Sequence, residues 1–206
     1  FDYDIGERST PRYSGDYRVD GPSEDDKQIL RLVAMFQMSF VGAPMIYYGT
    51  EAGMDGADDP CDRMPMVWDD LQYETRTLGP RTKLEKPYPV RFDRKLYSYF
   101  RELIRTRNDH RCLRRGSFEV LHADEQAGLL VYGRRLGDEA VIVALNRGEQ
   151  SASFDLRDTP MAKDATNLQR LVSSRQTSRT STGTRTGQQT LKLTVPARTG
   201  EVWQVQ

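Results

Sequence analysis

The stretch MSFVGAPMIYYGTEAGM, residues 38–54, decides the fold. It closes a segment in which apolar side chains recur at helical spacing, and this pattern predicts a helix over residues 24–40, ended by a glycine and a proline. The short apolar run at residues 45–48 stops at Gly49 and is typical of a fully buried strand. A helix, a tight turn and a buried strand in succession indicate a parallel α/β sheet or barrel.

No helical or strand period is sustained between Glu51 and about Arg91. Residues 51–75 carry eight acidic side chains against one basic side chain, Arg63. So long a stretch without periodicity is typical of a functional loop or of disorder. Apolar side chains then recur at helical spacing again and predict a second helix from Asp93 to about Asn108.

After Leu113 the period changes from that of a helix to that of strands. Gly137 and Asp138 form a hairpin signal, and residues 172–190, which are rich in Ser and Thr and contain no acid, predict a mobile loop or a protruding hairpin. Short strands at this spacing predict an antiparallel β-sandwich. The expected strands are 118–122, 128–134, 140–146, 151–156, 191–195 and 201–205.

The chain therefore divides near residue 112, into an α/β part at residues 1–111 and an all-β part at residues 112–206. The first part offers one strand and two helices, and a single parallel strand has no sheet to join. We expect the missing strands in a polypeptide segment upstream of Phe1.

Composition excludes several classes of protein. The 206 residues include 30 basic and 30 acidic side chains, so the formal net charge is zero, and we expect neither nucleic-acid binding through a basic field nor a transmembrane helix. The hydrophobic share of 37% is low for a complete globular domain, which fits a chain that lacks part of its natural core. The cellular compartment stays open.

Cysteine and histidine do not indicate a site. Cys61 and Cys112 cannot form a disulfide framework; they could be bridged once, but we expect two separate thiols. His110 and His122 lack ligand spacing relative to these cysteines, so we expect packing roles, no metal site and no cofactor.

The segment DDPCDRMPMVWDD, residues 58–70, is the strongest candidate site. Asp59 and Arg63 can form a charge-assisted pair that offers acceptors and donors to the hydroxyls of a neutral sugar, and Trp68 can stack on a pyranose ring. In the alternative interpretation the pair is a structural salt bridge and Trp68 plugs the core. The aspartates lack the spacing of a calcium loop.

Together with DDPCDRMPMVWDD, the opening stretch resembles the last barrel strand and following loop of the α-amylase family of glycoside hydrolases, and of its neopullulanases and cyclomaltodextrinases above all. LIRTRNDHRCLRRGSFEVL resembles the family's last barrel helix, and GDEAVIVALNRG and LTVPARTGEVWQV resemble strands of its C-terminal domain. The resemblance implies an α+β segment, consisting of the last strand and helices of a (β/α)₈ TIM barrel followed by an antiparallel β-sandwich.

The resemblance also implies a function and a binding pair. The family cleaves α-glucosidic bonds with retention, through carboxylates on earlier barrel strands, so no catalytic residue is expected in this chain. In the family's Asp-Pro-x-x-Arg-x-Pro pattern the Asp and Arg contact glucose units, and they match Asp59 and Arg63. Thr50 and Cys61-Asp62 depart from the family's usual residues. The implied partners are an α-glucan or maltooligosaccharide and the upstream barrel segment, and a homo-oligomer is left open.

Two other functions are less well supported by the sequence. A non-catalytic carbohydrate-binding or scaffolding β-sandwich would need exposed aromatic rings, yet residues 112–206 hold only four, mostly at positions expected in strand cores: Phe118, Tyr132, Phe154 and Trp203. An independent hydrolase using carboxylates of residues 51–75 would lack framework strands to hold them.

Overall fold

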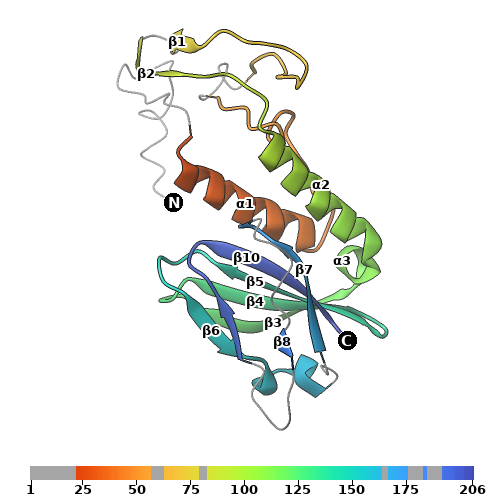
Figure 1. Cartoon of the computed structure of the whole chain (residues 1–206). Coiled ribbons are helices and arrows are strands. Elements are labelled where there is room, and N and C mark those ends of the chain that lie inside the picture. The colour runs from red at the N-terminus through yellow and green to blue at the C-terminus, as the bar shows by residue number, and fades with distance from the viewer. Residues whose placement is uncertain (1–21, 57–62, 79–82, 164–166, 176–182, 185–191) are drawn as a thin grey trace, which may run out of the picture. The chain divides into compact units, whose positions relative to one another are not determined.

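The computed structural model describes residues 22–56, 63–78, 83–163, 167–175, 183–184 and 192–206 (Figure 1). Contacts group the described residues into two compact units. We call them the sheet unit, Glu24–Met45 with Tyr99–Gln206, and the loop unit, which contains Ile46–Ser98.

Both helices predicted from the sequence are confirmed. α1 spans Glu24–Ser39 and begins with three acidic residues, whose charges complement the positive end of the helix dipole. α2 spans Arg94–Asp109, and the Asp93 carboxylate caps it by accepting a hydrogen bond from the backbone N–H of Leu96 at 2.9 Å. None of the described helices is long and apolar enough to cross a membrane.

The buried strand predicted at residues 45–48 is wrong. This segment is irregular and turns at Gly49, where φ is +82°. Met45 is 75% exposed and Tyr47 is 50% exposed. A parallel strand needs neighbours for its backbone hydrogen bonds, and the described strands pair only in antiparallel fashion and with one another. The barrel end expected from this segment thus stays a prediction.

The sheet unit contains a six-stranded antiparallel sheet and a two-stranded one. Their predicted strands are confirmed with small changes of boundary, as is the turn at Gly137, where φ is +59°. The larger sheet has the order β3 (Ser117–Asp124), β4 (Leu129–Leu136), β5 (Glu139–Asn146), β10 (Thr199–Val205), β7 (Asn167–Ser173) and β8 (Gly183–Thr184), and the smaller pairs β6 (Ala152–Asp155) with β9 (Lys192–Val195).

Both faces of the six-stranded sheet are covered (Figure 1). On one face α1 packs so closely that a Cβ atom on Gly200 would lie 2.7 Å from Met35 Sδ and 3.1 Å from Leu32 Cδ2. The other face packs on β6 and β9 and forms the apolar core, whose members from β4, β5, β6, β9 and β10 include Val131, Ile142, Phe154, Val195 and Trp203. A mostly antiparallel β domain is thus confirmed.

The sequence did not predict every element. It missed β7, β8, the hairpin of β1 (Arg76–Leu78) and β2 (Lys83–Tyr88), and the short helices α3 (Arg111–Arg115), η2 (Leu156–Asp158) and η3 (Pro160–Lys163). β7 ends within the expected insertion 172–190 and pairs with β8, which favours the hairpin interpretation for the described part. Residues 176–182 and 185–191 of that insertion lie outside the described residues.

Candidate functional site

The predicted binding pair can be placed only in part. Asp59 and Cys61 lie outside the described residues, whereas Arg63 is described and exposed. Beside Arg63 the backbone is anchored, because the Tyr48 hydroxyl donates to the Met64 carbonyl oxygen at 2.8 Å. The pairing of Asp59 with Arg63 therefore stays a prediction. The structure shows only that the backbone next to Arg63 is held at Met64.

A tight turn leads into this segment. The backbone N–H of Met54 donates to the Gly49 carbonyl oxygen at 2.9 Å, and a Cβ atom on Gly49 would collide with the Met54 side chain. The Met54 sulfur in turn lies 3.4 Å from the Val67 backbone nitrogen, and Ala52 in the turn is fully buried. The contact of Met54 with Val67 thus connects this turn to the segment that follows Arg63.

Trp68 projects from the same loop. Its side chain is 55% exposed, so the interpretation of Trp68 as a core plug does not hold within the loop unit. The Trp68 backbone N–H donates to the Tyr73 hydroxyl at 2.6 Å, and the next residue, Asp69, pairs with Arg94 at the start of α2 at 2.8 Å. These contacts hold the backbone on both sides of an exposed indole, which suits it to stack on a flat ring.

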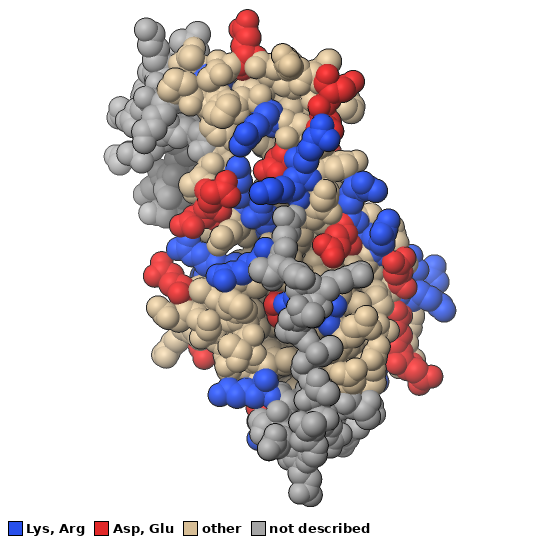
Figure 2. Space-filling model, viewed as in Figure 1, with Lys and Arg blue, Asp and Glu red and all other residues tan. Residues whose placement is uncertain are grey.

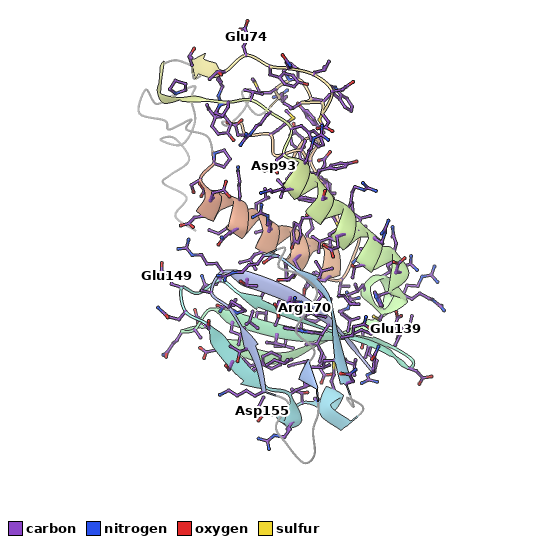
Figure 3. The ribbon with its side chains drawn as sticks, viewed as in Figure 1. Glu74, Asp93, Glu139, Glu149, Asp155 and Arg170 are labelled. Atoms are coloured by element: carbon purple, nitrogen blue, oxygen red, sulfur yellow. The ribbon has the colours of Figure 1, made fainter. Side chains whose placement is uncertain are left out.

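The loop unit also holds a pocket of about 420 Å³ that the sequence did not indicate. Asp55 and Arg76 in its lining form an ion pair, and the Arg76 guanidinium lies 5.5 Å from the centre of the Tyr88 ring. Figure 3 shows Glu74, another lining residue, in the extended segment before β1 and Asp93 at the start of α2. No local motif marks Asp55 and Arg76 as partners, since they lie 21 positions apart.

The histidines and Cys112 have structural contacts. Glu139 accepts from the backbone N–H of Cys112 at 2.8 Å, and its other oxygen lies 3.1 Å from Nδ1 of His110. The Cys112 thiol is buried and free, and burial, with the nearby Glu139 charge, raises its pKa to about 12. The His122 ring stacks on Phe154. Within the described ranges no group of three or more His, Cys, Asp or Glu residues could hold a metal ion.

Acidic and basic side chains are interspersed over the described part of the face shown in Figure 2. On that face, as in the whole sequence, charges of both signs are mixed, and no broad basic field covers it.

Comparison with known proteins identifies the β part. Residues 116–203 match the model of the family described as the α-amylase C-terminal domain. The β part of the chain is thus similar to that family. A cyclomaltodextrinase of Geobacillus thermopakistaniensis (strain MAS1) is 33% identical over 165 residues, which cover 78% of this chain and 22% of the relative. Neopullulanase 2 of Thermoactinomyces vulgaris is 39% identical over 121 residues, covering 58% of this chain and 17% of the relative.

Solved structures agree on the fold. The native debranching enzyme of Nostoc punctiforme has a TM-score of 0.61 and 28% identity, and the match covers 86% of this chain and 31% of that one. An Anoxybacillus α-amylase, at 20% identity, has a TM-score of 0.65 over 98% of this chain and 41% of its own. The resemblance of the chain to the C-terminal part of α-amylase-family proteins is confirmed, and the chain spans about a fifth of the first curated relatives.

Proposed function

We propose that this chain is the C-terminal part of a retaining glycoside hydrolase that acts on α-glucosidic bonds of maltooligosaccharides, cyclodextrins or starch-like glucans. The observation that carries the proposal is the similarity to a cyclomaltodextrinase. The aligned region is 165 residues long, so it is longer than the family match at residues 116–203 and extends outside the β domain. In this proposal residues 1–111 complete the catalytic barrel and residues 112–206 form its C-terminal β-sandwich.

Asp59 and Arg63 would bind glucose units of the substrate rather than take part in bond cleavage. The exposure of Arg63, the anchored backbone at Met64 and the exposed Trp68 support a binding role for this loop. A guanidinium donates several hydrogen bonds in a fixed plane and a carboxylate accepts them, so the pair suits neighbouring sugar hydroxyls.

The cleavage step would come from an upstream barrel segment. Retention requires two carboxyl groups about 5–5.5 Å apart, one as nucleophile and one as acid and base. The exposed apolar side chains of Met45 and Tyr47 support this proposal, because an upstream segment would cover them. This chain alone would then be inactive.

The test is kinetic and uses the polypeptide of the complete reading frame. With β-cyclodextrin the expected first product has the α-anomeric configuration, observed by proton NMR before mutarotation. Arg63→Met should lower kcat/KM for long maltooligosaccharides more than for maltotriose and leave the melting temperature unchanged. A lower melting temperature with normal kinetics would instead make Arg63 part of a structural salt bridge.

The alternative, a non-catalytic carbohydrate-binding or scaffolding β-sandwich, has less support. Tyr132, Phe154 and Trp203 are at most 3% exposed, and the half-buried Phe118 packs on Phe40 and Tyr132. The described part of residues 112–206 thus offers a sugar no aromatic platform. Saturable binding of maltoheptaose that survives Arg63→Met and Trp68→Ala would favour the alternative.

A further inference from the structure

The pocket of the loop unit has the size of a small-molecule site. Its volume of about 420 Å³ falls within the range of roughly 300–1,000 Å³ that is typical of ligand pockets. Four segments line it, around Met54, Met64, Arg76 and Tyr88. The lining is mostly apolar or aromatic, through Met54, Met64, Pro65, Val67, Tyr73 and Val90.

The charged side chains of the lining are Asp55, Glu74, Arg76 and Arg91, and two of them, Asp55 and Arg76, form an ion pair. Arg76 donates to Oδ2 of Asp55, and both side chains are largely buried, at 16% and 17% exposure. Two acidic and two basic side chains make the lining formally neutral, so it favours a neutral ligand over an ion. A carboxylate has about four acceptor positions, so Asp55 can accept a hydroxyl group in addition to the guanidinium.

The apolar part suits an aromatic ring. Methionine side chains adapt their shape, and their sulfur atoms make favourable contacts with ring edges. Tyr73 and Tyr88 add two aromatic rings, which pair with another ring in offset or edge-to-face arrangements. A sugar with many hydroxyls would lose their hydration against Met54, Val67 and Val90, which supply no partners for them.

We propose that this pocket binds a neutral aromatic alcohol, whose ring packs on the methionine and tyrosine side chains and whose hydroxyl donates to Asp55. The proposal does not rest on the hydrolase assignment, because the pocket lies wholly within the described loop unit. It adds to the sugar-binding loop a site for a ligand of different chemistry.

Methionine methyl groups offer a direct test in the intact 206-residue chain. In a sample with ¹³C-methyl methionine, Met54 and Met64 report on the pocket, whereas Met35 and Met161, buried in the sheet unit, serve as internal controls. Phenol should shift the Met54 and Met64 methyl signals saturably and leave the two controls unmoved. Toluene has nearly the same shape without the hydroxyl and should bind about tenfold more weakly.

Variants at exposed positions keep the test independent of folding. Thr77 lines the pocket and Gln72 does not, and both are exposed. Thr77→Trp should abolish the phenol shifts, and the matched control Gln72→Trp should retain them. Saturable shifts with maltose but not phenol would overturn the proposal, as would equal affinity for phenol and toluene or the absence of any saturable shift. None of these outcomes bears on cyclodextrin hydrolysis.

Discussion

The guanidinium of Arg134, on β4, donates a hydrogen bond to the carbonyl oxygen of Ser39, the last residue of α1, at 2.6 Å. The same side chain, 1% exposed, also donates to the carbonyls of Leu113, Gly116 and Ser117. Carbonyls at helix ends lack intrahelical partners and carry partial negative charge. Arg134 thus joins α1, the end of α3 and the start of β3 through one buried cation.

Arg107, on α2, is a second arginine that donates hydrogen bonds to several backbone carbonyls. Its guanidinium donates to the carbonyls of Met38 at 2.7 Å and Leu113 at 3.0 Å. Burial, together with the charge of Arg134, lowers the pKa of Arg107 from its ordinary value. The attachment of α1 to the β domain therefore depends on two arginines as well as on apolar packing.

Replacement of Arg134 by methionine should lower the free energy of unfolding by about 3 kcal/mol or more, because it leaves several buried carbonyls without a donor. Urea unfolding followed by circular dichroism measures the change. Arg114→Met is the matched control, since Arg114 is exposed in α3, and should change stability by at most about 0.5 kcal/mol. Equal effects of the two variants would contradict the role of Arg134.

Gly200→Ala should destabilise the chain by about 1–3 kcal/mol, because the new methyl group would meet Met35 Sδ at 2.7 Å and Leu145 Cδ2 at 2.9 Å. A double-mutant cycle with Met35→Ala should show a compensating coupling energy, since the shorter side chain makes room for the methyl group. Strict additivity of the two unfolding free energies would argue against close packing of α1 at Gly200.

The buried pair of Glu201 and Arg170 should make stability depend on pH (Figure 3 labels Arg170). Burial raises the pKa of Glu201 above its ordinary value of 4.5, although Arg170 opposes the shift. The folded state therefore holds this proton more tightly, and the contribution to stability is lost as pH rises from about 4.5 through the folded-state pKa.

The measurement is the unfolding free energy of the parent chain minus that of Glu201→Gln, taken across this pH range. The difference should fall as pH rises. A difference that grows with pH would mean that Arg170 outweighs burial and that the pKa of Glu201 is lowered.

Trp68→Ala should leave the unfolding free energy within about 0.5–1 kcal/mol of the parent, because the indole is 55% exposed. In the complete enzyme that we propose, the same change should weaken binding of maltotetraose, measured by isothermal titration calorimetry. Unchanged affinity with a loss of several kcal/mol in stability would show that Trp68 is a packing residue in the complete protein.

The sequence predicted those helices and strands in which apolar side chains recur at the spacing typical of the element. α1, α2 and most strands follow from apolar spacing, and the turn at Gly137 from its dipeptide. The segment at residues 45–48 failed because a short apolar run becomes a strand only when neighbouring strands take its hydrogen bonds. β7 was missed because Arg170 interrupts its apolar pattern, and its charge is compensated by Glu201 on the neighbouring strand.

The candidate site was predictable to a smaller extent. Arg63 and Asp59 stood out through the pattern of residues 58–70 and its resemblance to a family. The pocket could not be predicted, because it arises where Asp55 and Arg76, distant in the sequence and ordinary in type, meet across the loop unit.

The most direct test of the central claim compares hydrolysis of β-cyclodextrin by the polypeptide of the complete reading frame with hydrolysis by this 206-residue chain, at equal concentration. We expect maltose and glucose from the complete polypeptide and no release above background from the chain. Turnover by the isolated chain at rates typical of enzymes would contradict the account, as would a complete polypeptide that cleaves no α-glucosidic bond.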